Sequence, residues 1–150
     1  MNTTPAEPSA HAKGRILFVE EDPVLRERLQ HALGEAGYVI VEAADFDGDY
    51  NEGAAPDLLL LDLDLQSSSA WDRYAEWKAR FPKLCTVAFT SVPNRFGVAR
   101  DVGINALMEK PVEPSLLLLV TASVIEECNR SGAQRAADSR PDFRYLTRAD

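Results

Sequence analysis

The stretch Ala55-Pro56-Asp57-Leu58-Leu59-Leu60-Leu61-Asp62-Leu63-Asp64 determines how the rest of the chain is interpreted. Four consecutive leucines end at a carboxylate, and a second carboxylate follows two residues later. An apolar run this short, entered through a proline, is typical of a strand buried on both faces. Ligands of open parallel sheets bind outside the carboxyl ends of the strands, which would place Asp62 at a binding edge. From this stretch alone, Asp62 could equally cap a strand and meet water.

The composition indicates one soluble globular domain. The chain has 150 residues, of which 45% are hydrophobic and 27% charged, so it can build a substantial core. The formal net charge of −8 argues against nucleic acid or an anionic membrane as a partner. Cys85 and Cys128 have neither metal-binding spacing nor a disulfide-rich context, so inert reduced thiols in a cytoplasm are expected. No secretion signal is recognisable, and the longest apolar run, 116–120, is too short to span a bilayer.

Apolar patterns and breaker residues predict alternating strands and helices. Strands are expected at 15–19, 38–41, 58–61, 85–91 and 106–110, with helices at 23–36, 43–55, 70–81, 94–102 and 114–129. The helix at 43–55 is expected to be short or irregular, because Gly48 and Gly53 each cost about 1 kcal/mol in a helix. Asp22 and Ser69 are predicted helix N-caps. The element order predicts a doubly wound α/β domain at 14–130 between a disordered leader, 1–13, and a flexible tail, 131–150.

The helix at 70–81 carries an aromatic stripe. Trp71, Tyr74, Lys78 and Phe81 share one helical face, and Trp77 is offset from them. This stripe is predicted to pack against the sheet rather than to bind a cofactor.

Polar side chains follow the predicted strands at the points where they end. They are Glu20 and Glu21 after the first strand, Asp62 after the third, Thr90 and Ser91 after the fourth, and Lys110 after the fifth. Parallel strands share one carboxyl edge, so these groups are expected to meet in a single crevice. Clustered carboxylates are tolerated around a divalent cation, and Mg²⁺ takes a few carboxylates plus waters. The lysine and the hydroxyl could bind the oxygens of a phosphoryl group while the central carboxylate attacks phosphorus.

This ordered set resembles the residues of response-regulator receiver domains, over Gly14 to Arg130. The shared features are an acidic pair after the first strand, an aspartate after an apolar strand, Thr-Ser after the next and Lys-Pro after the last. The resemblance implies a flavodoxin-like fold, with a five-stranded parallel sheet of order 2-1-3-4-5. It also implies a stand-alone signalling module, not an enzyme, which accepts a phosphoryl group from a histidine kinase or phosphotransfer protein and requires Mg²⁺.

The same resemblance assigns roles to individual residues. The phosphorylation machinery would consist of the phosphoacceptor Asp62, the switch hydroxyl Thr90 and the phosphate-pairing Lys110. The metal ligands would be Glu20, Glu21, Asp62 and the backbone carbonyl of Asp64. No role is assigned to the side chain of Asp64.

Four features depart from the family's pattern, one of which is the helix predicted at 43–55, which is interrupted by glycines and poor in apolar anchors. Glu21 stands where an aspartate usually binds the metal, and its extra methylene is expected to weaken the binding of Mg²⁺, which demands near-ideal octahedral distances. Gln66, Ser69 and Ala70 replace the usual Pro and Asp-Gly of the loop after the third strand. Leu107 occupies the aromatic switch position, so no ring can swing towards the switch hydroxyl. The phosphorylation centre is mostly present, but the relay from it is altered.

Output is expected through protein contacts or onward phosphorelay, because the tail after Arg130 is too short to fold a DNA-binding module. The face formed by the fifth strand and the last helix, with Leu107 and Val112 exposed, is the expected surface for a partner or a homodimer. Phosphorylation would act on this face by a population shift.

Two other interpretations stay open at this point. The departures at Glu21 and Leu107 also suit a receiver-like interaction module that is never phosphorylated. The sequence Asp62-Leu63-Asp64 further resembles the paired aspartates of haloacid-dehalogenase-type phosphatases. That family normally has Thr or Val where Gln66 stands, and its further acidic residues follow the lysine, whereas here an acidic pair precedes Asp62.

Overall fold

The structure is a computed structural model that describes residues 13–41, 55–66, 69–92, 96–130 and 144–146. The predicted leader up to residue 12, the predicted helix at 43–55 apart from its last residue, and most of the predicted tail lie outside the described residues. No helix among the described residues is long and apolar enough to cross a membrane.

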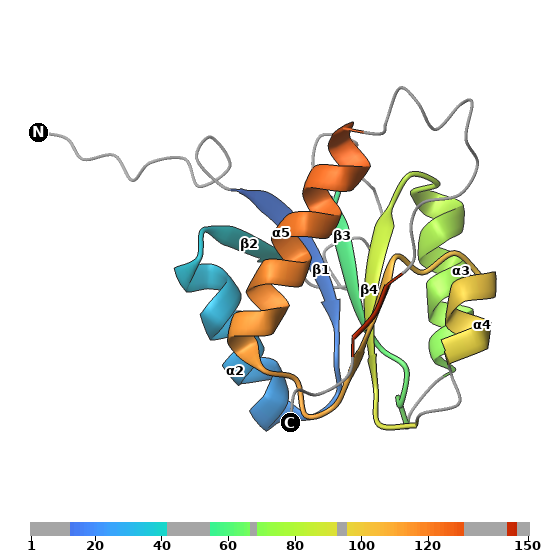
Figure 1. The fold of residues 1–150 in the computed structure, drawn as a ribbon, viewed down its shortest axis with the longest axis horizontal. Helices are drawn as coiled ribbons and strands as arrows, with labels where there is room; N and C mark the ends of the chain where they lie inside the picture. Colours follow the sequence, from blue (N-terminus) through green and yellow to red (C-terminus); the bar gives the residue numbers. More distant parts are fainter. Residues whose placement is uncertain (1–12, 42–54, 67–68, 93–95, 131–143, 147–150) are drawn as a thin grey trace, which may run out of the picture.

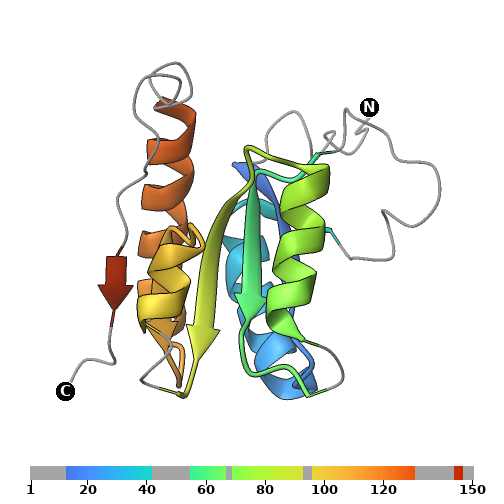
Figure 2. The same ribbon diagram turned by 90° about the vertical axis from the view of Figure 1, so that its right-hand side faces the viewer.

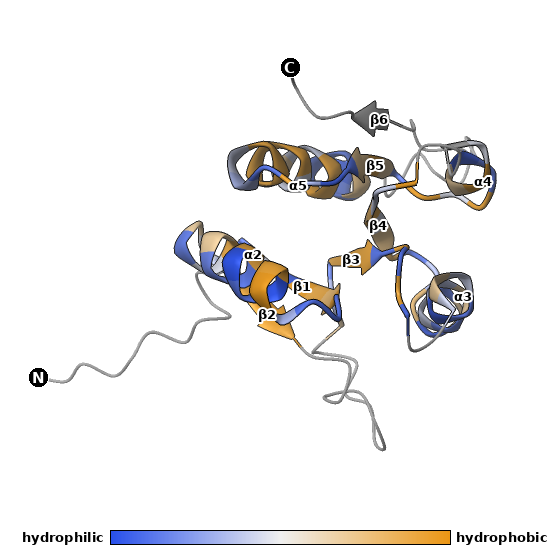
Figure 3. Cartoon of the chain, turned by 90° about the horizontal axis from the view of Figure 1, so that it is seen from below, coloured by the Kyte–Doolittle hydropathy of each residue, from blue (hydrophilic) through white to orange (hydrophobic). Residues whose placement is uncertain are grey.

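Six parallel strands form one sheet in the order β2-β1-β3-β4-β5-β6 (Figures 1 and 3). The strands are β1 Gly14–Val19, β2 Tyr38–Val41, β3 Leu58–Asp62, β4 Cys85–Thr90, β5 Ala106–Glu109 and β6 Arg144–Leu146. The predicted strands occur in the predicted order 2-1-3-4-5, and each neighbouring pair is parallel. The flavodoxin-like, doubly wound fold is therefore confirmed, with β6 added at one edge.

Helices cover both faces of this sheet. They are α2 Pro23–Glu35, α3 Ala70–Arg80, α4 Phe96–Asp101 and α5 Pro114–Arg130. Helices α2 and α5 pack on one face, while α3 and α4 lie on the other (Figures 2 and 3). The predicted N-caps are confirmed, because Asp22 accepts from the Val24 N–H at 3.0 Å and Ser69 accepts from the Asp72 N–H at 3.3 Å.

Strand β3 lies inside the sheet and is buried on both faces, as predicted. Leu58 and Leu60 belong to the core under α2 and α5, whereas Leu59 and Leu61 belong to the core under α3 and α4. Successive side chains of a strand point to opposite faces, so an unbroken apolar run is needed where helices cover both. This packing places Asp62 at the carboxyl end of β3, between β1 and β4.

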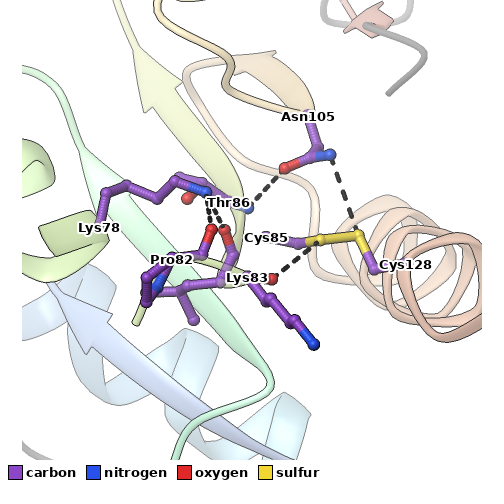
Figure 4. The surroundings of a disulfide bond; sticks show 8 residues. Lys78, Pro82, Lys83, Cys85, Thr86, Asn105 and Cys128 are labelled. Carbon is purple, nitrogen blue, oxygen red and sulfur yellow. Dashed lines mark hydrogen bonds between the residues drawn. A yellow bond between two sulfur atoms is a disulfide. The ribbon is translucent and has the colours of Figure 1, made fainter. Parts of the chain in front are cut away.

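The aromatic stripe of α3 packs against the sheet, as predicted, but its composition differs. Tyr74 and Trp77 are buried in the core, so the prediction that Trp77 is offset was wrong. Lys78 lies one turn after Tyr74 on the same face, and its ammonium extends beyond the helix to donate to the carbonyls of Pro82 at 3.0 Å and Leu84 at 2.9 Å. The lysine thereby binds the turn that follows the helix, as Figure 4 shows.

Strand β6 lies within the predicted flexible tail at 131–150 and was not among the predicted strands. Arg144–Leu146 pairs in parallel with β5, placing Ala106 opposite Arg144 and Met108 opposite Leu146. The outer edge of β5 offers unpaired N–H and C=O groups to any extended segment. Backbone pairing of this kind depends little on an apolar pattern, which is why the composition of the tail did not reveal it.

The face of β5 and α5 is less apolar at its surface than predicted. Leu107 and Val112 were expected to be exposed but are buried, Leu107 in the core under α3 and α4 and Val112 in the core under α5. The exposed large apolar side chains of the described residues are Val24 on α2, Val98 on α4, Val102 just after α4 and Leu119 on α5.

Cys85 and Cys128 form a disulfide, so the prediction of two reduced thiols was wrong (Figure 4). The bond joins the first residue of β4 to the last turns of α5, whose Cα atoms lie 6.7 Å apart, within the usual range for disulfides. The buried Asn105 lies beside it, accepting from the Thr86 N–H at 2.8 Å and donating to Cys128 Sγ at 3.9 Å. The two cysteines are 43 residues apart in sequence, so only the packing of α5 on β4 brings them together.

Candidate functional site

The site lies at the carboxyl edge of the sheet, where Asp62 ends β3 and Lys110 follows β5. The Lys110 ammonium lies 2.9 Å from Asp62 Oδ1. The carboxylate of Asp62 is almost fully buried, with 3% of the residue exposed. A backbone bond from Lys110 N–H to the Thr90 carbonyl, 2.9 Å, ties the lysine to the end of β4. The structure thus brings Asp62 and Lys110 together, as predicted.

Asp64 binds the hydroxyl groups at the end of β4. Thr90 Oγ1 donates to Asp64 Oδ1 at 2.7 Å, and Asp64 Oδ2 accepts from both the N–H and the hydroxyl of Ser91, at 2.8 and 3.0 Å. The Lys110 ammonium is 3.6 Å from the same Oδ2. The Asp64 N–H in turn donates to Asp62 Oδ1 at 2.9 Å. The two aspartates therefore share one cation and are bonded to each other through the backbone.

The charges at this edge shift the pKa values of the groups that meet there. Burial alone would lower the pKa of Lys110, but the hydrogen bond and charge of Asp62, with the charges of Glu20 and Asp64, raise it on balance. Burial would raise the pKa of Asp64, but the hydrogen bonds from Thr90 and Ser91 and the charge of Lys110 lower it. The lysine thus remains protonated and Asp64 ionised at neutral pH.

Glu20 lies beside Asp62 and carries the largest shift at the site. Only 4% of Glu20 is exposed, and burial raises its pKa from 4.5 to about 7, with the neighbouring Asp62 charge adding to the effect. The Asp22 N–H donates to Glu20 Oε2 at 3.1 Å and partly opposes the shift. Glu20 Oε1 is buried and has no hydrogen-bond partner among the described residues. A buried carboxylate oxygen with no donor suits a ligand that supplies positive charge.

Glu21 is exposed and turns to the loop after β3, where its Oε1 accepts from the Gln66 N–H at 2.8 Å. The side chain of Gln66 also donates to the Asp64 carbonyl, at 3.1 Å. Gln66 therefore binds two of the predicted metal ligands at once. Its role was missed by sequence reasoning, which treated it only as a replacement for the family's usual loop residues.

The oxygen atoms at this edge fit Mg²⁺ in part. Glu20, Asp62 and the Asp64 carbonyl are hard donors of the kind Mg²⁺ takes, and Glu20 Oε1 has no competing donor among the described residues. Within the described ranges, however, no three Asp, Glu, His or Cys side chains gather closely enough to hold a metal. Glu21 is the predicted ligand that the structure does not bring into position.

The raised pKa of Glu20 predicts a pH-dependent stability. Between pH 4.5 and about 7 the folded chain keeps a proton on Glu20 that the unfolded chain has lost, so the free energy of unfolding should fall as the pH rises through this window. The lowered pKa of Asp64 affects the free energy of unfolding only below pH 3.8, the ordinary value for an aspartate. Its effect has the opposite sign, because the stability it contributes is lost as the pH falls. The measurement is urea unfolding at several pH values in chelator-treated buffer, compared with Glu20→Gln. A wild-type profile parallel to that of Glu20→Gln would contradict the prediction.

Comparison with solved structures identifies the fold. A receiver domain protein described as CheY-like, from Methanospirillum hungatei, matches with a TM-score of 0.67 and 20% identity, over 79% of this chain and 98% of that one. The receiver domain of the sensor histidine kinase PA1611 from Pseudomonas aeruginosa, solved with magnesium in its active-site cleft, matches with a TM-score of 0.59 and 21% identity, over 77% and 99%. NtrX from Brucella abortus matches with a TM-score of 0.67 and 23% identity, over 85% of this chain but 29% of its own.

No protein-family model and no curated protein matches the sequence. The comparisons thus establish that the chain has the fold of CheY-like response-regulator receiver domains.

Proposed function

We propose that the chain is a receiver domain that accepts a phosphoryl group on Asp62 from the phosphohistidine of a histidine kinase or a phosphotransfer protein. The ion pair between Lys110 and the buried Asp62, 2.9 Å long, is the observation that carries the proposal. A receiver needs an aspartate at the end of the central strand with a cation beside it, and this arrangement lies on the receiver fold.

The transfer would use the carboxylate of Asp62 as the nucleophile. One Oδ attacks phosphorus, the N–P bond of the phosphohistidine breaks, and its electron pair stays on the imidazole nitrogen, which then takes up a proton. Lys110 would neutralise charge on the transferred oxygens, and the Thr90 hydroxyl would donate to one of them. The product is an acyl phosphate on Asp62.

Mg²⁺ would be held by Glu20, Asp62 and the carbonyl of Asp64, with Glu21 joining after release from Gln66. When bound, the ion supplies neutralising charge to the phosphoryl oxygens. The bonds from Gln66 to Glu21 and Asp64 compete with these ligands, so we expect weak binding of the metal in addition to any effect of the longer Glu21 side chain.

Signalling would proceed through protein contacts on the face of α4, β5 and α5, where Val98 and Leu119 are exposed, or through onward phosphorelay. Sedimentation before and after phosphorylation tests for a homodimer, and an unchanged monomer would leave a separate partner protein as the output. The proposed location is the cytoplasm, which requires that the fold persist when the disulfide between Cys85 and Cys128 is reduced.

The decisive test of the proposed function is labelling with a small phosphodonor. Wild-type protein incubated with acetyl phosphate and Mg²⁺ is expected to gain an acid-stable, hydroxylamine-labile adduct, and Asp62→Asn is expected to gain none. Mass spectrometry of the intact chain measures both. Steady release of phosphate from added monoesters would instead indicate a phosphatase.

A second function is favoured by the contacts of Asp64 and Gln66. Asp64 and Gln66 already bind the donors and the metal ligand that phosphorylation would need. These contacts are compatible with a receiver-like module that binds partners and is never phosphorylated. No adduct on wild-type protein or on any Asp64 variant, at any Mg²⁺ concentration, would decide for this module.

A further inference from the structure

We propose that the carboxylate of Asp64 occupies the position of the transferred phosphoryl group in the unmodified chain, so that phosphorylation of Asp62 must displace it. This inference rests on the proposed function and specifies how the same site is regulated. Removing the carboxylate should therefore open the site to a phosphoryl group or to an oxyanion that imitates one.

The contacts of Asp64 are those expected of a bound oxyanion. Its two oxygens accept from the Thr90 hydroxyl, from the N–H and hydroxyl of Ser91, and lie near the Lys110 ammonium. Each distance to Thr90 and Ser91 is between 2.7 and 3.0 Å. These donors lie at the carboxyl ends of β4 and β5, at the same rim as Asp62, where the proposed transfer places the new phosphoryl oxygens.

The donors cannot serve two oxyanions at once. The Ser91 N–H has a single hydrogen, and it points to Asp64. The Thr90 hydroxyl oxygen accepts from the Val92 N–H at 3.0 Å, which fixes the hydroxyl while its single hydrogen serves Asp64. A phosphoryl group that needs either donor must first break the bond to the carboxylate.

Electrostatics makes displacement necessary as well. Lys110 lies 2.9 Å from Asp62 and 3.6 Å from Asp64, so this cation is already shared by two carboxylates. Phosphorylation adds about 1.5 to 2 negative charges at the same rim. The extra repulsion should drive Asp64 outwards, and because its carbonyl accepts from Gln66, the loop after β3 should move with it. The movement of this loop would report phosphorylation without an aromatic switch at Leu107.

The experiment compares wild-type protein with Asp64→Ala and Asp64→Asn. Glu126→Gln, an exposed carboxylate on α5 away from the site, is the matched control for a lost negative charge. With acetyl phosphate and Mg²⁺, Asp64→Ala should form the adduct at least about tenfold faster than wild type, equivalent to about 1.4 kcal/mol. The control should match wild type, and beryllofluoride should bind Asp64→Ala more tightly by a similar factor.

A second readout does not depend on phosphorylation. In ¹H–¹⁵N spectra, the Ser91 amide should move upfield in Asp64→Ala, because it loses a carboxylate acceptor, and beryllofluoride should move it back. A well-dispersed spectrum of the variant shows at the same time that it is folded. A Ser91 resonance that stays in place would overturn the proposal.

The outcomes separate this inference from the proposed function. Equal labelling rates in wild type and Asp64→Ala, with labelling lost in Asp62→Asn, would overturn the displacement and leave the phosphoacceptor standing. Labelling of Asp64→Ala alone would support displacement in its strongest form. No labelling of either chain would remove the proposed function and the displacement with it.

Discussion

Reduction of the disulfide between Cys85 and Cys128 is expected to lower the free energy of unfolding by about 4 kcal/mol. The bond closes a loop between residues 43 apart, and in the chain-entropy model such a loop restricts the unfolded chain by about that amount. The folded chain changes little, because α5 packs on the sheet through its own apolar face. A loss of this size is a large fraction of the about 5 to 15 kcal/mol that domains usually possess.

Urea unfolding with and without a phosphine reductant measures the effect. A double variant with Cys85→Ala and Cys128→Ala is the control, since the reductant should leave its unfolding midpoint unchanged. If oxidised and reduced wild-type protein unfold at the same urea concentration, the bond does not contribute as expected. The reduced protein is also the form on which phosphodonor labelling should be repeated, because a cytoplasmic receiver would have to work in that state.

The fold was predictable because local and global signals agree along the chain. Strand β3 combines a short apolar run with burial on both faces, and the caps at Asp22 and Ser69 lie where the sequence pattern places them. The meeting of Asp62 and Lys110 was predictable for the same reason, since parallel strands bring their carboxyl ends to one edge. These features follow from the type of residue and its place on an element.

The features that the sequence did not reveal depend on which of several possible neighbours a side chain or a strand edge binds. Asp64 and Gln66 find their partners through rotamers and loop geometry, which spacing does not specify. Whether Cys128 faces Cys85 depends on how α5 is rotated about its axis when it packs on the sheet, and the sequence pattern does not give that rotation. Strand β6 pairs with the edge of β5 through backbone groups, and such an edge can pair with many sequences. The departures from the family's pattern drew attention to the loop after β3, at Gln66. They did not predict that Gln66 binds Glu21 and the Asp64 carbonyl.

Replacing Lys110 by Met is expected to lower the free energy of unfolding by about 3 kcal/mol, because breaking a buried pair leaves an unpaired buried charge. The side chain of Asp62 is 5% exposed and loses its cation, and Asp64 loses the same positive neighbour.

Urea unfolding at neutral pH measures this effect, with Lys83→Met as the control for an exposed lysine. Adding Asp64→Asn to Lys110→Met should restore part of the loss, because one fewer carboxylate then competes for positive charge, and the interaction follows from the double-mutant cycle. A Lys110→Met variant as stable as Lys83→Met would mean that Lys110 balances no buried charge. The ion pair with Asp62 could then no longer be taken as what organises the site. A cation that stabilises neither carboxylate in the unmodified chain would not be expected to stabilise a bound phosphoryl group either.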